Sequence, residues 1–265
     1  MKIVDCFIFY NELDLLKYRL YALTGIVDHF VIIEANQTFM GRDKELYSTK
    51  LNSILQDLGE KITHAIIDLP FREGVLSTAN GNQWENERFQ RNYIEVVINK
   101  LELKREDIII ISDIDEIPDP DTLYRVKTQE IPITIQSLEQ DFYYYNLESK
   151  FINKWYSSKI ISYGLFKNLG RTCDEIRNYA CDTIELGGWH LSYFGNKEFI
   201  RNKIRNYSHN EHNIETRTNL ENIQRCIDST ECIIGKEHSM IKVPISENQY
   251  LPPKYKDYLN MFYSI

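Results

Sequence analysis

The chain has 265 residues, of which 43% are hydrophobic and 26% charged, a balance typical of a globular protein. Its formal net charge of −8 argues against a nucleic-acid partner, which would call for a basic surplus. No apolar run approaches the roughly 20 residues of a membrane span, so we expect no membrane span and a cytoplasmic protein. Five cysteines without a Cys-x-x-Cys favour free thiols over disulfides or a zinc site.

The first 125 residues alternate strand-like and helix-like segments. We predict strands over residues 3–10, 27–35, 62–69 and 107–112, and the last contains the four consecutive isoleucines typical of a strand buried on both faces. Helices are expected after Asn11, over residues 50–58 and from Asn82 to Leu101. This alternation predicts an α/β fold with an open, mostly parallel sheet, which binds its ligands at the carboxyl ends of the strands.

The pattern changes after residue 130. Longer segments at 133–146 and 155–166 predict mixed or antiparallel strands, and residues 187–195 predict a short strand with glycine breaks. Residues 197–207 and 218–227 have helical spacing. Because no repeat or linker interrupts the chain, we predict one domain over residues 1–265.

Two aspartates, Asp113 and Asp115, follow the four-isoleucine strand directly. Two residues apart on a strand, their side chains would point to the same side, with α-carbons about 6.5 Å apart. Such carboxylates can share a divalent cation that bridges to a diphosphate. Two like charges beside a buried strand end are costly unless something positive binds there. The pattern therefore favours a metal–diphosphate site over a solvated acidic turn.

The same Asp-x-Asp has a second interpretation. Haloacid-dehalogenase-type phosphatases place it after an apolar strand and use the first Asp as nucleophile. Their motif usually lies near the N-terminus and continues with Thr or Val, whereas here Glu116 follows. A phosphatase using Asp113 stays open as an alternative, as does a nucleotide-sugar-binding protein without catalysis.

Further polar side chains are expected at the same edge of the sheet. Asn11 and Glu12 follow the first strand and Glu34 ends the second, an arrangement suited to a nucleotide site. Arg91, on the helix before the acidic strand, could reach this cleft and pair with a phosphate. His190, in a Gly-Trp-His sequence, is either a metal ligand or a histidine of the core.

Six sequence blocks, collinear over almost the whole chain, resemble one known family. They are residues 5–20, 27–31, 34–39, Asp-Ile-Asp-Glu-Ile-Pro at 113–118, Gly-Trp-His-Leu-Ser at 188–192 and, weakly, 253–255. Together they resemble glycosyltransferase family 17, the family of the bisecting β-1,4-mannosyl-glycoprotein N-acetylglucosaminyltransferase. We expect the protein to lack the membrane anchor and stem of the Golgi members, and to be a soluble bacterial or viral-type member acting on a surface-glycan precursor.

The resemblance implies a GT-A (Rossmann-like) fold and inverting transfer of a sugar, GlcNAc or a related one, from a UDP-sugar to a glycan acceptor hydroxyl. It implies Mn²⁺ or Mg²⁺ bound by Asp113, Asp115 and His190, with Asp113 also at the diphosphate. Arg91 and Asn92 resemble the pair that approaches the nucleotide in related transferases. Residues 1–125 would bind the nucleotide sugar and residues 126–265 the acceptor, which a lipid could carry at a membrane surface.

An inverting transfer also needs a base that takes the proton of the acceptor hydroxyl. The candidates downstream of the acidic motif are Asp141, Asp174, Glu175, Glu185 and Glu211. Glu175 is attractive because residues 163–166 could be the glycine loop that precedes the base in other GT-A families. Glu211 is the alternative, and either could equally be a surface acid. Tyr143, Tyr144, Tyr145 and Trp155 could stack on the acceptor sugar or pack in the core.

Overall fold

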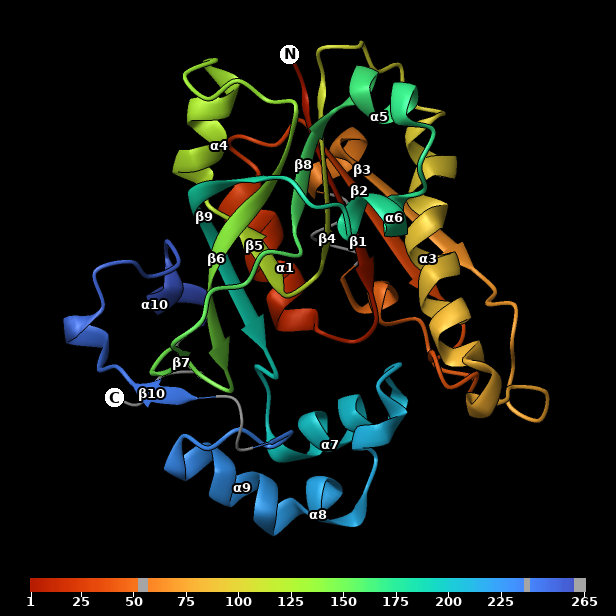
Figure 1. Cartoon of the computed structure of the whole chain (residues 1–265), viewed down its shortest axis with the longest axis vertical. Helices are drawn as coiled ribbons and strands as arrows, with labels where there is room; N and C mark the ends of the chain where they lie inside the picture. Colours follow the sequence, from red (N-terminus) through yellow and green to blue (C-terminus); the bar gives the residue numbers. More distant parts are fainter. Residues whose placement is uncertain (52–56, 236–238, 260–265) are drawn as a thin grey trace.

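A ten-stranded mixed sheet forms the centre of the structure, a computed structural model that describes residues 1–51, 57–235 and 239–259 (Figure 1). Its N-terminal strands run parallel in the order β4-β1-β2-β3. Their bounds are β1 (Ile3–Phe9), β2 (His29–Ala35), β3 (Ile62–Ile67) and β4 (Ile108–Asp113). The parallel strands and the helices that flank them confirm the predicted α/β fold class.

The C-terminal strands pair mainly antiparallel, as expected beyond residue 130. They are β5 (Glu116–Pro118), β6 (Ile135–Tyr144), β7 (Ser149–Phe151), β8 (Lys159–Ser162), β9 (Asp182–Ser192) and β10 (Met240–Lys242). Strand β8 joins the two halves of the sheet, antiparallel to both β4 and β6. The strand predicted over 155–166 is wrong before Lys159 and beyond Ser162, where β8 reaches Ile108, the first residue of β4. Helix α5 (Tyr163–Leu169) begins there instead.

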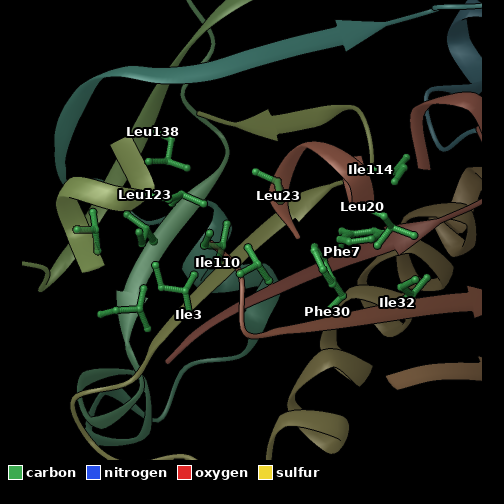
Figure 2. Packing of buried hydrophobic residues seen from close by; sticks show 14 of the residues in the cluster. Ile3, Phe7, Leu20, Leu23, Phe30, Ile32, Ile110, Ile114, Leu123 and Leu138 are labelled. Carbon is green, nitrogen blue, oxygen red and sulfur yellow. The ribbon is translucent and has the colours of Figure 1, made fainter. Parts of the chain in front are cut away.

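The four isoleucines of β4 are buried on both faces of the sheet, which confirms the prediction. Ile108 and Ile110 pack against α1 (Leu13–Leu23) and α4 (Pro120–Lys127), in the cluster drawn in Figure 2. Ile109 and Ile111 point the other way, toward α3 (Asn82–Ile98), α5 and α6 (Cys173–Arg177). Each buried isoleucine contributes about 1.5–3 kcal/mol, so this strand end is a rigid base for the residues that follow it.

The remaining helices lie mainly below the carboxyl ends of the strands in Figure 1. They are α7 (Lys197–Asn206), α8 (Glu215–Thr218), α9 (Leu220–Ser229) and α10 (Tyr255–Tyr258), and α7 and α9 confirm the two predicted C-terminal helices. Short 3₁₀ turns cover Tyr47–Leu51, Gly59–Lys61, Thr78–Asn80, Asn210–His212 and Ile245–Glu247. The helix predicted over residues 50–58 lies largely outside the described residues.

Two further expectations can be compared with the structure. All five cysteines are free, as predicted. Across the described ranges, no helix is both long enough and apolar enough to pass through a membrane.

A close passage between β5 and β9 depends on Gly188. Its φ of +134° lies in a region that other residues rarely enter, and a β-carbon there would lie 2.0 Å from the Ile117 carbonyl oxygen. We expect Gly188→Ala to lower the free energy of unfolding by about 2 kcal/mol or more in urea titrations. Gly25→Ala, whose added β-carbon meets no atom within 4 Å, should change it by less than about 0.5 kcal/mol. Equal effects of the two substitutions would contradict this account.

Candidate active site

A cavity of about 490 Å³ opens at the carboxyl ends of β1 and β4, the edge at which the sequence predicted a site. This volume lies in the range of small-molecule sites. One side is polar, and is formed by side chains that include Glu12, Glu87, Asp113, Asp115, Arg177 and Lys203. The other side is aromatic, and comes from β6, β9 and the segment after α7.

A buried arginine shapes the turn that carries the acidic residues. Strand β4 ends at Asp113, and Asp115 lies in the turn that follows, so the expected strand geometry does not extend to the second carboxylate. Arg19 of α1 pairs with Asp5 of β1, with 2.6 Å between Nη2 and Oδ1, and both side chains are fully buried. Its Nη1 also donates at 2.7, 3.2 and 3.0 Å to the carbonyl oxygens of Asp113, Ile114 and Glu116.

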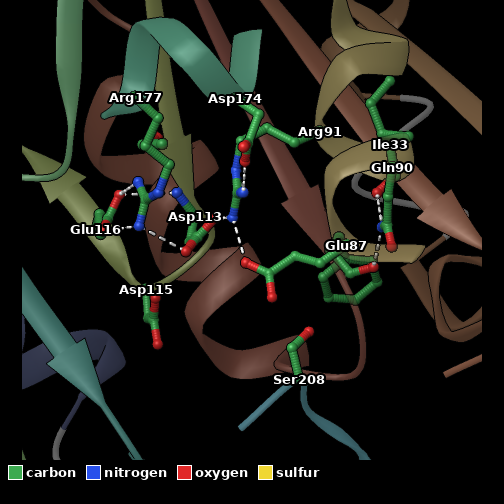
Figure 3. Close-up of polar contacts among 12 residues, drawn as sticks. Ile33, Glu87, Gln90, Arg91, Asp113, Asp115, Glu116, Asp174, Arg177 and Ser208 are labelled. Carbon is green, nitrogen blue, oxygen red and sulfur yellow. Dashed lines mark hydrogen bonds and ion pairs between the residues drawn. The ribbon is translucent and has the colours of Figure 1, made fainter. Parts of the chain in front are cut away.

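Two arginines hold the carboxylate of Asp113 (Figure 3). Its Oδ2 accepts from Arg177 at 2.8 Å and its Oδ1 from Arg91 at 3.1 Å. Arg177 also donates two hydrogen bonds to the carboxylate of Glu116, from Nη1 to Oε2 and from Nη2 to Oε1, each 2.6 Å long. Burial would raise the pKa of Asp113, but the charges of Arg177 and Arg91 outweigh it and hold the pKa below its usual value. Asp113 is therefore ionised at neutral pH.

Arg91 does not line the cavity, although it contacts Asp113. Its side chain is 4% exposed and contacts Glu87, Asp113 and Asp174. The Oδ1 of Asn92 accepts a hydrogen bond from the backbone N–H of Asp174 at 2.9 Å. Arg91 and Asn92 thus fasten α6 to α3, and the arginine that faces the cavity is Arg177, which the sequence analysis did not single out.

Asp115 meets a different pair of groups. Its Oδ2 lies 2.8 Å from Nζ of Lys203, and its Oδ1 lies 3.6 Å from Nε2 of His190. Lys203 also approaches Glu12, with 3.3 Å between Nζ and Oε1. Burial would raise the pKa of Asp115, but Lys203 and then His190 hold it well below its usual value. The structure therefore brings Asp115, His190 and Glu12 together, and adds Lys203, which was not predicted.

Asp115 and His190 fit a divalent cation. Two ligands of one ion, each about 2.1 Å from it, lie roughly 3–4 Å apart, and the 3.6 Å between Oδ1 and Nε2 falls in that range. Because Lys203 uses the other oxygen of Asp115, it need not be displaced. The charges of this cluster also favour a bound cation, because its acids outnumber its three permanent cations by three. The acids are Glu12, Glu87, Asp113, Asp115, Glu116 and Asp174, and the cations are Arg91, Arg177 and Lys203.

Like Arg91 and Asn92, two further predicted nucleotide contacts, Glu34 and Asn11, lie away from the cavity lining. Glu34 is fully buried, and its carboxylate accepts from Lys44 at 3.0 Å and from the Tyr47 backbone N–H at 2.7 Å. Its second oxygen lies 3.1 Å from His64. Asn11 is also absent from the lining, and its buried Oδ1 has no hydrogen-bond partner within the described part of the chain.

Glu175 has a local structural role. It is exposed, and it forms a reciprocal capping box with Thr172 at the start of α6, with 2.8 Å from the Thr172 N–H to its Oε2. The glycine loop expected before it is wrong, because residues 163–166 belong to helix α5. Gly164 is needed there for packing, since a β-carbon would lie 2.9 Å from the Arg105 carbonyl oxygen.

None of the five candidate base residues belongs to the cavity lining, but Glu211 contacts a residue that does. Its Oε1 lies 2.7 Å from Nδ1 of His209, and both His209 and His212 line the cavity. Asp141 is buried between Lys150 and Lys154, Asp174 binds Arg91, and Glu185 is exposed on β9.

The aromatic wall includes two of the four predicted aromatic residues. The ring of Phe142 stacks between Phe151, at 4.1 Å, and His190, at 4.6 Å. Trp155 lies 4.5 Å from the His190 ring, and its Nε1 donates to Glu116 at 2.6 Å. Tyr144 lines the cavity as well. Tyr143 and Tyr145 pack into separate hydrophobic clusters instead.

This fold and cavity define an α/β protein whose cavity lies at the carboxyl ends of parallel strands, the usual place for a ligand in such sheets. More particularly, the family model of glycosyltransferase family 17 matches residues 1–238, and the chain belongs to that family of glycosyltransferases. No curated protein matches the sequence.

The solved structures that resemble this chain include three described here. The chain resembles residues 1–349 of TarS from S. aureus at 12% identity and a TM-score of 0.43, over 86% of this chain and 72% of that one. A longer TarS structure gives the same identity and TM-score over 86% and 44%. The 4-diphosphocytidyl-2C-methyl-D-erythritol synthase of Anaerococcus prevotii gives 9% identity and a TM-score of 0.36, over 75% and 95%.

Proposed function

We propose that this glycosyltransferase moves a sugar, GlcNAc or a related one, from a UDP-sugar to a hydroxyl of a glycan acceptor, with inversion at the anomeric carbon and with Mn²⁺ or Mg²⁺. The observation that carries the proposal is the pairing of Asp115 with His190 at 3.6 Å, beside Asp113, in the cavity at the strand ends. A cation held by Asp115 and His190 would offset the charge that develops on the leaving diphosphate.

Two protein cations would assist at the same place. Lys203 and Arg177 both line the cavity, and carboxylates fix the position of each cation, Glu12 and Asp115 for Lys203 and Asp113 and Glu116 for Arg177. Preorganised cations stabilise a developing negative charge because they need no reorganisation when the reaction occurs. Asp113 has both oxygens engaged by arginines, which makes it a poor nucleophile and argues against the phosphatase alternative.

The aromatic wall would hold the acceptor. Phe142, Tyr144 and Trp155 belong to the half of the chain after residue 126, whereas the acids at the strand ends belong to residues 1–125. Aromatic rings pack well against the apolar face of a sugar ring. Tyr144 and Trp155 would serve this purpose, whereas Phe151 and His190 already cover the two faces of Phe142. The division agrees with a donor half and an acceptor half, and an acceptor carried by a lipid could reach the same wall from a membrane surface.

A thermal-shift screen of UDP-, GDP- and CMP-sugars, with and without Mn²⁺, tests this function. We expect a UDP-sugar with Mn²⁺ to raise the melting temperature by about 5–10 °C at a hundred times its Kd, and the other nucleotides to do less. A turnover assay for released UDP follows. Phosphomonoester hydrolysis without UDP-sugar binding would establish the phosphatase, and binding without turnover would establish a non-catalytic protein.

A further inference from the structure

An imidazole–carboxylate pair lies at the cavity, in the segment that follows α7. Nδ1 of His209 is 2.7 Å from Oε1 of Glu211, and the His209 side chain lines the cavity. A carboxylate only accepts hydrogen bonds, so in the neutral imidazole Nδ1 carries the proton and Nε2 keeps its lone pair. Resting on the proposed transfer, we infer that His209 is the base that takes the proton of the acceptor hydroxyl, and that Glu211 positions it.

The other acids of the cavity are already paired with cations. The carboxylates that line it are Glu12, Glu87, Asp113 and Asp115. Each contacts Lys203, Arg91 or Arg177 within 3.3 Å. A carboxylate that contacts a cation would lose the attraction of that contact if it took the proton of the acceptor. His209 contacts a carboxylate instead, and this contact stabilises the imidazole once it is protonated.

Helix α3 links the segment of His209 to the acidic end of the cavity. Its ring packs edge-on against Trp84 at 4.6 Å, and Ser208 donates to the carbonyl oxygen of Gln83 at 3.3 Å, so the segment is fixed to the first turn of α3. Arg91, which holds Asp113, lies seven residues along the same helix, about 10 Å along its axis. That interval leaves room for a sugar ring between the base and a diphosphate bound at the strand ends.

The same cluster could be taken for a metal site. Among the described residues, the potential ligand atoms of His209, Glu211 and His212 lie within 4.8 Å of one another. However, the guanidinium of Arg217 contacts Nδ1 of His212. An imidazole that accepts at Nδ1 carries its proton on Nε2, which lies 4.0 Å from Oε1 of Glu211, and the charge of Arg217 opposes a second cation. These contacts favour a hydrogen-bonded group that orients His209.

The proposed step balances as a single displacement. The acceptor oxygen forms a bond to the anomeric carbon, and its proton moves to Nε2 of His209. The bond from that carbon to the diphosphate oxygen breaks, and its electron pair leaves with the diphosphate. The imidazolium that forms is stabilised by Glu211 and later returns its proton to solvent.

The test compares His209→Gln and Glu211→Gln with the matched control Glu215→Gln, an exposed acid on α8. The substrate is the nucleotide sugar selected by the thermal-shift screen, with water or glycan as acceptor, and the readouts are kcat and calorimetric UDP affinity with Mn²⁺. We expect His209→Gln to lower kcat by about 10²–10⁴-fold, Glu211→Gln to lower it by about tenfold, and UDP affinity to stay within twofold. Added imidazole should restore part of the rate of His209→Gly and none of that of Glu211→Gln.

Three results would overturn the assignment. Full turnover by His209→Gln would refute the base while leaving the proposed transfer intact. A wild-type protein that binds no nucleotide sugar, or binds one without releasing UDP, would refute both. Two zinc results together would make the cluster a metal site instead. The wild type would take up one equivalent of Zn²⁺, and His209→Gln and Glu211→Gln would abolish this uptake. Wild-type turnover would be lost in EDTA, and Zn²⁺ but not Mn²⁺ would restore it.

Discussion

Asp115→Asn should abolish Mn²⁺-dependent binding of UDP and lower sugar transfer by at least about 100-fold. The substitution keeps the shape of the side chain but removes the charge that faces both His190 at 3.6 Å and Lys203 at 2.8 Å. Without that charge, a cation between Asp115 and His190 loses its anionic ligand. Lys203 keeps Glu12 as a partner, so we expect the fold to survive.

Calorimetric titration of UDP with and without Mn²⁺, and a turnover assay, measure this effect. Asp182→Asn is the matched control, because Asp182 is exposed at the start of β9, and it should behave as wild type. A melting temperature of Asp115→Asn close to that of wild type would show that the loss is local. Unchanged Mn²⁺-dependent UDP affinity in this variant would refute the assignment of Asp115 to the cation.

Arg19→Met should lower the free energy of unfolding by about 3–5 kcal/mol, the usual cost of breaking a fully buried ion pair. The variant leaves Asp5 charged and unpaired in the core, and it removes the donor that binds three carbonyl oxygens of the turn around Asp115. In a chain of this length, that loss corresponds to a melting temperature lower by on the order of 10 °C. Because the turn loses its shape, UDP binding should weaken as well.

Urea and thermal unfolding measure the change, with Arg88→Met as the control. Arg88 pairs with Glu85 on the exposed face of α3, where its side chain is 44% accessible, and its loss should change stability by less than about 1 kcal/mol. Similar losses for the two arginines would mean that the buried network contributes little.

The parts of the fold that local sequence determines were predictable. The isoleucines of β4 and the leucine spacing of α1 report burial directly, because strand and helix periods decide which side chains enter the core. The boundary at Ser162 was not predictable, since β8 ends where its partner β4 begins, and that depends on pairing between distant segments. The same holds for residues 163–166, which have no local feature that separates a strand from α5.

The acidic part of the site could be found from its place after a buried strand, but its cations could not. Arg177 and Lys203 come from helices 64 and 88 residues away from their aspartates, and nothing in their own neighbourhood marks them. For Glu34 the position at the strand end could be predicted, but the direction of its side chain could not. Glu34 lies one residue before the end of β2, but its side chain contacts His64 of β3 and Lys44, which come from other segments of the chain.

Pulsed electron paramagnetic resonance of bound Mn²⁺ tests the central claim most directly. With UDP added, the account predicts one Mn²⁺ that shows ³¹P coupling from the diphosphate and ¹⁴N coupling from one imidazole, and the ¹⁴N signal should vanish in His190→Gln. A ³¹P coupling without ¹⁴N would remove His190 from the cation. UDP that binds equally well in EDTA, with no Mn²⁺ retained, would contradict a cation-dependent site at the end of β4.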